Sequence, residues 1–379
     1  MSENKNTNLN LNRSMNFNLN VNEHQERKEL EIVRDHYNSL PHLSQQERKN
    51  SSIIRGIRSF NNWIKSVLIH IAIEEVNLQK KKKNSKSSYI CVGDFACGVG
   101  GDLGKYKRIP SIVEYVGIDC ADESLKEAQS RHETDQQKQR NKSNKNNILV
   151  EWKQCDLRKE ELQLPQIFDL ISCQFALHYG CGAYKHVYSW LENINYHMKI
   201  GSVCIATWFN ANRILSLFKT NTTSSAQSNR NTVFSNSLWK FEFETDQNLI
   251  KSENAFDKKQ NNNNYSYRNE TEQKEKEQDE LYNAFGHRYL FSLKEAVDSC
   301  PEYLVPTEFI VKIAKEKFGL CLQQEWKSLE DIFTQYQNQP ILQQRLIDMN
   351  VINSQGKLQM SLEEWQLVQL YSAFLFVKQ

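Results

Sequence analysis

The sequence predicts an α/β fold built on a mostly parallel, twisted sheet with helices on both faces. Three observations predict it. From residue 88 onward, short apolar runs alternate with segments of helical periodicity, which is the pattern of βα units. The first run opens into a glycine-rich turn at 96–101, where sheets of this kind bind nucleoside ligands. A last apolar run, 370–377, is β-prone enough to close the same sheet as an antiparallel strand.

Composition limits the class of protein. The 379 residues suffice for one large domain or two, and a formal charge of +2 confines any basic surface to local patches. Nine cysteines without a CxxC pair predict reduced core thiols and no metal site. The longest apolar stretch, 63–73, is too short to span a bilayer, and the first residues lack a signal peptide's apolar core. We therefore expect a soluble intracellular protein without a membrane partner.

The N-terminal third is polar before it becomes helical. Residues 1–24 are rich in asparagine and are predicted to be a disordered tail. Charged and apolar residues recur at helical spacing over 25–76 and predict two helices that cover the edge of the domain. The lysine run 80–83, with Lys86, fits a nuclear import signal, a phosphate-binding loop or a plain solvated loop, and these interpretations stay open.

The parallel strands are predicted at the apolar runs 89–95, 113–120, 148–156, 168–175 and 202–208. The first three runs end at or near Asp94, Asp119 and Asp156. Because the carboxyl ends of parallel strands lie at one edge of a sheet, these carboxylates and the glycine turn should converge on one crevice.

The C-terminal half contains an abrupt change of composition. After a helix at 210–219, the segment 219–281 is a polar, low-complexity insertion, ordered at most where 233–244 alternates like a strand. Order resumes at 286–293, 300–306 and a helix at 307–318, and ends in the closing strand. Residues 25–379 thus form one predicted domain that this insertion interrupts.

The crevice has the chemistry of a nucleoside site. Asp119 follows the turn at the end of the second strand, where a carboxylate can accept both hydroxyls of a ribose, as in a nicotinamide cofactor or S-adenosylmethionine. Two facts favour the second. The turn lacks the GxGxxG spacing that seats a pyrophosphate. Asp94 and Asp102 would also repel a pyrophosphate but attract the amino group of a methionine moiety. Asp156 is then placed to accept from the exocyclic amine of adenine.

Segments of the chain resemble, in order, the eukaryotic mRNA cap guanine-N7 methyltransferases. They are HYN (36–38), RKNSSI and RSFNNWIKS (48–66), DFACGVGGDLGKY (94–106), YVGIDCADESLKEAQSR (115–131), FDLISCQFALHY (168–179), FGHRYLFSL (285–293) and PEYLV (301–305). FNNWIK, QFALHY and PEYLV are the most specific, whereas many methyltransferases share the glycine turn. The resemblance implies a class I S-adenosylmethionine-dependent methyltransferase fold with a seven-stranded sheet, and methyl transfer to N7 of the 5′ guanosine cap of mRNA.

The resemblance also implies site residues. Those for the cofactor are Asn61, Lys65, Asp94, Ala96, Gly98, Asp102, Asp119, Asp156 and Gln174. Those for the cap are His178, Tyr179, Glu302, Tyr371, Arg131 and Lys105. By similarity, Lys65 pairs with the methionine carboxylate and Glu302 accepts from guanine N1–H and N2–H₂. His178 and Tyr179 meet the guanine and its ribose, Tyr371 packs on the base, and Arg131 with Lys105 approaches the cap phosphates.

The acceptor decides the expected mechanism. Guanine N7 carries a lone pair and no proton, so no catalytic base and no metal are needed, and orientation of N7, methyl and sulfur supplies the rate enhancement. The family's turn usually reads DLGCGKGGD, but this chain has Ala96 and Val99 in place of a glycine and the lysine. An alanine can be accommodated at position 96 if its φ is negative.

Two rival functions stay open because of these departures: a non-catalytic cap-binding or adaptor subunit, and a methyltransferase for another small acceptor. The expected partner is 5′-capped mRNA, with the RNA triphosphatase, the guanylyltransferase and the RNA polymerase II machinery as candidate protein partners. A nuclear monomer is expected.

Overall fold

The computed structural model describes residues 31–35, 52–139, 148–219, 232–256 and 279–379. Its central sheet has seven strands: β1 (Ile90–Phe95), β2 (Ile112–Asp119), β3 (Leu149–Gln154), β4 (Phe168–Gln174), β5 (Met198–Phe209), β10 (Leu320–Trp326) and β11 (Tyr371–Lys378). The strand order is β10-β11-β5-β4-β1-β2-β3. Neighbours from β5 to β3 pair in parallel, while β11 is antiparallel to both β5 and β10. The predicted sheet and its closing antiparallel strand are confirmed, and β10 is a strand that the sequence did not single out.

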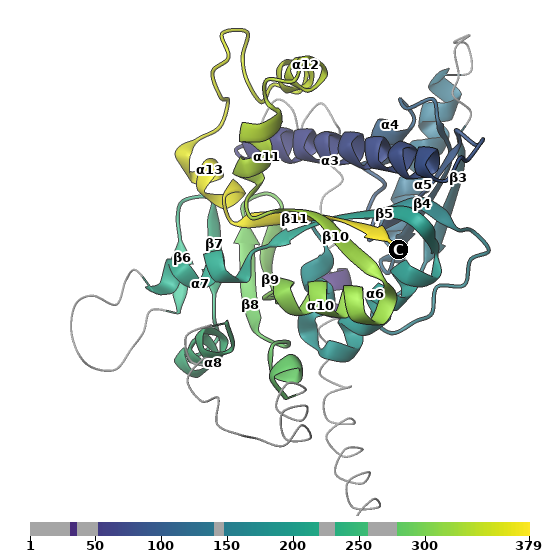
Figure 1. The fold of residues 1–379 in the computed structure, drawn as a ribbon. Coiled ribbons are helices and arrows are strands. Elements are labelled where there is room, and N and C mark those ends of the chain that lie inside the picture. The colour runs from purple at the N-terminus through teal and green to yellow at the C-terminus, as the bar shows by residue number, and fades with distance from the viewer. Residues whose placement is uncertain (1–30, 36–51, 140–147, 220–231, 257–278) are drawn as a thin grey trace, which may run out of the picture.

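Helices cover both faces of this sheet (Figure 1). Along β5, Val203 and Ile205 join the apolar core under the long helix α3 (Arg55–Lys82), whereas the alternate residues Cys204 and Ala206 join the core on the other face. That second core contains α6 (Tyr184–Tyr196) and α10 (Thr307–Phe318). The second of the two predicted N-terminal helices is α3, which packs across β5 and β4 on a face of the sheet and not at its edge, while most of the first lies outside the described residues.

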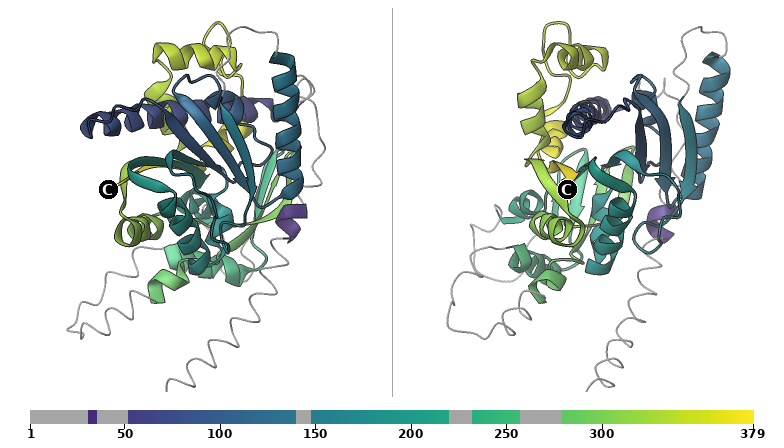
Figure 2. Two further views of the ribbon diagram at one scale, coloured as in Figure 1. Left: turned by 90° about the vertical axis from the view of Figure 1, so that its right-hand side faces the viewer. Right: turned by 45° about the vertical axis from the view of Figure 1, so that its right-hand side comes forward.

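Three short helices pack against α3 from its other side: α11 (Leu329–Tyr336), α12 (Pro340–Asp348) and α13 (Leu362–Val368). Figure 2 shows these segments gathered beside α3 and away from the strands β1 to β3. Contacts across this bundle include a hydrogen bond from the indole of Trp63 to the carbonyl of Leu342 at 2.9 Å. The bundle leaves one wall of α3 facing the glycine turn.

A second, antiparallel sheet has the order β6 (Val233–Ser235), β7 (Trp239–Glu242), β8 (Arg288–Leu293) and β9 (Val297–Tyr303). It follows α7 (Ala211–Lys219), where a helix was predicted. The expectation that order in the insertion is limited to a strand-like stretch was wrong, since α8 (Asp246–Phe256) lies within it. Tertiary contacts explain this polar helix: Leu249 is buried and Ser252 is hydrogen-bonded to His287 at 3.1 Å.

The lysine run is the end of a helix and not a loop. Residues 80–82 form the last turn of α3, where positive charge interacts favourably with the helix dipole. Lys80 Nζ lies 3.2 Å from a carboxylate oxygen of Asp169, and Lys83 Nζ donates to the carbonyl of Ile200. The run therefore fixes the end of α3 to neighbouring strands.

The remaining predictions concern the cysteines, membrane-spanning helices and residues that the structure does not describe. All nine cysteines are free, as expected of reduced thiols, and five of them are buried. Within the described ranges, no helix is long and apolar enough to cross a membrane. The predicted tail 1–24 and the HYN segment lie outside the described residues, and the division into a tail and one interrupted domain stays a prediction.

Candidate functional site

The predicted crevice lies at the carboxyl edge of the parallel strands. Asp94 is in β1, Asp119 ends the neighbouring strand β2, and Asp156 follows the end of β3 by two residues. The glycine turn and α4 (Leu103–Tyr106) follow β1, and α5 (Asp122–Gln139) begins after β2. The 3₁₀ helix η1 (Leu177–Gly182) follows β4. The sheet topology thus brings the three carboxylates, the turn and η1 to one edge.

The glycine turn has an open side. Ala96, Gly98 and Gly100 have φ angles of +57°, +53° and +66°. A Cβ on Gly100 would lie 2.6 Å from the ring of Trp152, so only glycine fits there without displacement. A Cβ on Gly98 would meet no atom within 4 Å, which leaves room for a ligand against the main chain. The condition for accommodating an alanine at position 96, a negative φ, is not met, because the turn holds Ala96 in the left-handed region.

Replacing Ala96 by glycine tests this strain. The left-handed conformation costs an L-residue about 1–2 kcal/mol, and the greater freedom of unfolded glycine offsets about half of that gain. We expect Ala96→Gly to raise the free energy of unfolding in urea by about 0.5–1 kcal/mol. A loss of stability would contradict the left-handed backbone at this residue.

Asp119 ties the turn to the start of α5. Its Oδ2 accepts from the backbone N–H of Gly98 at 2.7 Å, and its Oδ1 accepts from that of Ala121 at 2.9 Å. Burial raises the pKa of Asp119, while these bonds oppose the rise. Each carboxylate oxygen keeps a second lone pair, so both can still accept from the hydroxyls of a ligand.

Two lysines meet a buried carboxylate beside the turn. Asp102 accepts from Lys65 Nζ at 2.8 Å and from Lys105 Nζ at 2.6 Å. Burial alone would raise the pKa of Asp102, but the two lysines lower it to about 2. Burial and the charge of Asp102 raise the pKa of Asp94 to about 7, and the Tyr115 hydroxyl donates to Asp94 at 2.7 Å. Because Asp102 is ionised, it balances the charge of only one of the two lysines. The other positive charge is left for an anionic ligand group.

The same end of the crevice holds an unsatisfied acceptor. The side-chain oxygen of Asn61, one turn before Lys65 on α3, is buried and has no hydrogen-bond partner among the described residues. Buried polar atoms are normally paired, so an orphan here indicates a missing donor. An amino group beside a carboxylate, as at the end of methionine, satisfies both Asn61 and Lys65. The residues present therefore fit the amino-acid end of S-adenosylmethionine.

Two further residues predicted to bind the cofactor, Asp156 and Gln174, have protein partners. Both oxygens of Asp156 accept from the guanidinium of Arg158, at 2.9 and 3.0 Å. Gln174 accepts from Thr207 at 3.3 Å and donates to Ser172 at 3.2 Å. Asp156 can therefore accept from an adenine amine only with its remaining lone pairs.

The predicted cap residues His178 and Glu302 are in contact. His178 Nε2 lies 3.5 Å from Glu302 Oε1, and both side chains are buried. Within the described part of the chain, neither ring nitrogen of His178 has a hydrogen-bond partner. Burial lowers the pKa of His178 to about 3, so the ring is neutral. Burial also raises the pKa of Glu302 to about 8, although Tyr289 donates to it at 2.8 Å. This buried, incompletely satisfied pair is suited to a polar ligand.

Aromatic contacts join the two halves of the site. Lys65 Nζ lies 5.6 Å from the ring centroid of Phe175, which in turn lies 5.0 Å from that of Tyr371. Tyr371 stacks on Phe209 with centroids 3.9 Å apart, and Phe209 lies 6.2 Å from His178. The lysine end and the histidine end of the site are therefore linked by adjoining rings. One face of Tyr371 is already covered by Phe209.

Of the other residues predicted to bind the cap, Tyr179 lies beside His178, whereas Arg131 and Lys105 lie in another part of the crevice. The ring of Tyr179 lies 4.2 Å from that of His178, and its hydroxyl lies 4.0 Å from the sulfur of Cys300. Arg131 on α5 donates to Glu127 at 2.6 Å. Arg131 and Lys105 line a large pocket and not the surroundings of His178.

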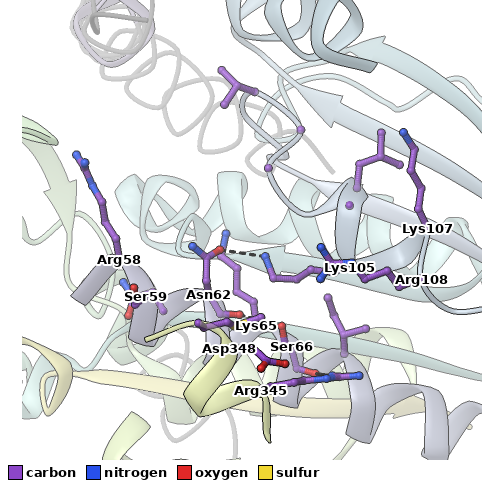
Figure 3. A pocket seen from close by; sticks show the side chains of 18 of the residues that line it. Arg58, Ser59, Asn62, Lys65, Ser66, Lys105, Lys107, Arg108, Arg345 and Asp348 are labelled. Carbon is purple, nitrogen blue, oxygen red and sulfur yellow. Dashed lines mark hydrogen bonds between the residues drawn. The ribbon is translucent and has the colours of Figure 1, made fainter. Parts of the chain in front are cut away.

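This pocket of about 1680 Å³ lies between α3, the turn with α4, α5 and α12. Figure 3 shows Lys65 and Lys105 extending into it from opposite walls. Asn61 also lines it, whereas Asp119, Asp156 and Glu302 do not. The pocket therefore reaches the lysine end of the crevice only. No group of His, Cys, Asp or Glu suited to a metal ion occurs among the residues that the structure describes.

Sequence reasoning missed several side chains that hold the site. They are Tyr115, Arg158, Phe175 and Tyr289. Arg158 could have been found, since it follows Asp156 by two residues. Tyr289 is paired with Glu302 through the register of β8 and β9, which no local pattern reveals.

The fold and this edge define a class of protein. Five parallel strands, a sixth in β10 and an antiparallel β11 inserted between β5 and β10 form the sheet of class I methyltransferases. The glycine turn after β1 and the carboxylate that ends β2 lie where that class holds its cofactor. The predicted fold class is confirmed.

The chain belongs to the mRNA (guanine-N(7))-methyltransferase domain family, whose sequence profile matches residues 20–379. The predicted resemblance is thereby confirmed.

Individual relatives agree. An mRNA cap guanine-N(7) methyltransferase of Cryptococcus neoformans var. neoformans serotype D (strain B-3501A) is 29% identical over 360 residues, which are 93% of this chain and 42% of that protein. The mRNA cap guanine-N(7) methyltransferase 1 of Oryza sativa subsp. japonica is 29% identical over 93% of this chain and 82% of its own length. The chain thus spans less than half of the Cryptococcus relative.

A solved plantazolicin methyltransferase is similar at 13% identity with a TM-score of 0.42, over 93% of this chain and 98% of that one.

Proposed function

We propose that the chain transfers a methyl group from S-adenosylmethionine to N7 of the 5′ guanosine cap of mRNA. Family membership supports the reaction class, and the relatives carry that activity in their names. The observation that carries the proposal is the buried His178–Glu302 pair, with two unpartnered ring nitrogens among the described residues, at the sheet edge that also holds the glycine turn. A purine base would satisfy this pair.

The cofactor half of the proposal uses the carboxyl edge of β1 to β4. Lys65 and Asn61 would hold the amino-acid end, and Asp119 would accept from the ribose hydroxyls. Gly98 gives the ligand room against the main chain, and Asp156 with Gln174 would face the adenine. The sulfonium of S-adenosylmethionine supplies an electrophilic methyl group when it is bound.

The guanosine half needs orientation rather than proton transfer. Guanine N7 has a lone pair and no proton, so no side chain has to act as a base. Glu302 would accept from N1–H and N2–H₂ and thereby fix the rotation of the base. His178, neutral at physiological pH, and Tyr179 would position the base and ribose, and Tyr371 would close the aromatic wall. Holding the two reactants in line is worth several orders of magnitude in rate.

His178→Ala separates positioning of the cap from cofactor binding. Loss of a buried polar contact to the base should lower kcat/KM for GpppA-capped RNA by about tenfold to a hundredfold, while the Kd for S-adenosylmethionine stays within about twofold. Initial rates and calorimetric titration measure the two quantities. An unchanged rate together with a weakened cofactor affinity would refute the positioning role.

The raised pKa of Glu302 predicts a pH dependence. Since the carboxylate must be ionised to accept from both guanine donors, cap binding requires loss of a proton whose pKa is about 8 in the free protein. Cap affinity should therefore rise by about fiftyfold from pH 6 to pH 8 and level off above it. His178 stays neutral over this range and adds no step. Fluorescence titration with GpppA measures the profile, and an affinity that is flat or falls with pH would contradict it.

The two rival functions give different results in the same experiments. A non-catalytic cap-binding or adaptor subunit would bind GpppA but give no heat of binding with S-adenosylmethionine. A methyltransferase for another small acceptor would bind the cofactor but show no dependence on the GpppN group. The free space at Gly98 and the side-chain oxygen of Asn61, which has no hydrogen-bond partner among the described residues, favour a cofactor-binding enzyme over a non-catalytic adaptor.

The biological setting of the proposal follows from the reaction. The substrate would be 5′-capped mRNA, and the natural protein partners would be the RNA triphosphatase, the guanylyltransferase and the RNA polymerase II machinery. Capping belongs to mRNA processing, which agrees with a place in the nucleus. The chain would act as a monomer, with one methyltransferase domain over 25–379, an insertion at 219–281 and no metal.

A further inference from the structure

The pocket beside the glycine turn carries more positive charge than the proposed cofactor requires. Of the described residues that line it, nine are arginine or lysine and three are aspartate or glutamate. Lys65 and Lys105 are engaged with Asp102. Further basic residues come from elements away from the turn: Arg108 follows α4 and Arg345 lies on α12 (Figure 3).

Arg108 and Arg345 form an uncompensated pair. Both arginines line the pocket, and burial together with the charge of Arg108 lowers the pKa of Arg345. Arg345 donates to the carbonyl of Ser66 at 3.4 Å, and in the described parts of the chain neither arginine forms an ion pair with a carboxylate. Asp348 lines the same pocket, but it accepts from Gln344 at 2.9 Å. Guanidinium groups are favoured partners of phosphate oxygens, and both of these line the same pocket, where a phosphate group can contact them.

The size and lining of the pocket indicate a chain rather than a small molecule. Its volume of about 1680 Å³ exceeds the roughly 300–1,000 Å³ of a pocket for one small ligand. Phe175 is the only Phe, Tyr or Trp among the described lining residues, so there is no platform on which successive bases would stack. Basic side chains without stacking rings favour recognition of a phosphate backbone without base specificity.

The position of the pocket links it to the cap. Arg131 and Lys105, proposed to approach the cap phosphates, line the same pocket as Arg108 and Arg345. We propose that this pocket is the path of the RNA chain that follows the cap, and that Arg108 and Arg345 together hold a backbone phosphate beyond the triphosphate. The proposal rests on the proposed cap methyltransferase function and gives it a second substrate contact.

The test compares RNA body with cap alone. The double variant Arg108→Gln/Arg345→Gln and the wild type are titrated with GpppA and with a GpppA-capped RNA of about 15 nucleotides, at several salt concentrations. We expect the wild type to bind the capped RNA more tightly than GpppA. The double variant should lose about tenfold in affinity for the RNA, keep its affinity for GpppA within about twofold, and lower the salt slope by about 0.7, the value for one phosphate contact.

A matched control removes the same charge elsewhere. Lys315 and Lys317 are exposed on α10, on the opposite face of the sheet, and do not line the pocket. Lys315→Gln/Lys317→Gln should bind both ligands as the wild type does. An equal loss in this control would show a general charge effect and overturn the proposal.

Two further outcomes would overturn it. In the first, the wild type binds the capped RNA no more tightly than GpppA. In the second, poly-L-glutamate binds the wild type and is lost in the double variant while RNA is unaffected, which would assign the pocket to an acidic protein segment. Failure of the wild type to methylate GpppA would instead contradict the proposed function, because that reaction does not depend on the RNA body.

Discussion

Glu302→Gln should reduce kcat/KM for GpppA-capped RNA by about 10³-fold, because a glutamine offers the guanine one acceptor where the carboxylate offers two. Its amide NH₂ would face a donor of the base, and sites built around buried polar pairs reject such mismatches strongly. The side chain is of equal size, and its oxygen can still accept from Tyr289, so the fold should persist. Initial rates with labelled S-adenosylmethionine measure the loss.

The controls for Glu302→Gln separate cap recognition from folding. Affinity for S-adenosylmethionine should stay within about twofold, and the rise of cap affinity with pH should disappear, because the titrating carboxylate is gone. Glu316→Gln, a matched change at an exposed residue of α10, should leave the rate unchanged. A cap activity within tenfold of the wild type would remove Glu302 from the guanosine site.

Asp119→Asn should weaken S-adenosylmethionine by about a hundredfold or more. The amide keeps one acceptor oxygen, whereas Asp119 must serve two backbone N–H groups and, in the proposal, two ribose hydroxyls. Hydrogen bonds to a charged group contribute about 1.5–3 kcal/mol each, so losing two accounts for the expected factor. Isothermal titration measures the affinity.

A neighbouring residue provides the control for this second variant. Asp122→Asn alters a partly exposed carboxylate at the start of α5 that pairs with Lys126, and it should leave cofactor affinity unchanged. Asp119→Asn should still bind GpppA nearly as the wild type does, which shows that the protein is folded. If cofactor affinity stays near normal, Asp119 is a structural tie for Gly98 and Ala121 and not a ribose ligand.

Much of the fold could be predicted because it follows from local patterns of apolar and acidic residues in the sequence. Each apolar run that ends near an acidic residue became a parallel strand, and the shared edge of parallel strands brought Asp94, Asp119 and Asp156 together. The end of the chain became β11 because its residues alternate between two buried faces. Predictions that depend on one element and its ends need no knowledge of distant partners.

The remaining features depend on tertiary contacts. Tyr289 meets Glu302 through the register of an antiparallel pair, and Ala96 is held at positive φ by the turn around it. The polar helix α8 is stabilised by burial of Leu249 and by the bond between Ser252 and His287. The charge of the pocket, which unites α3, α4, α5 and α12, likewise comes from elements far apart in the chain. None of these features can be predicted from a short segment of the sequence.

The most direct measurement is transfer of labelled methyl from S-adenosylmethionine to three acceptors in parallel: GpppA-capped RNA, ApppA-capped RNA and free GTP. Because Glu302 is proposed to read guanine N1–H and N2–H₂, label should enter only the guanosine acceptors, and the product should be 7-methylguanosine. Equal labelling of ApppA-capped RNA, or label at any other position, would contradict the proposed reaction.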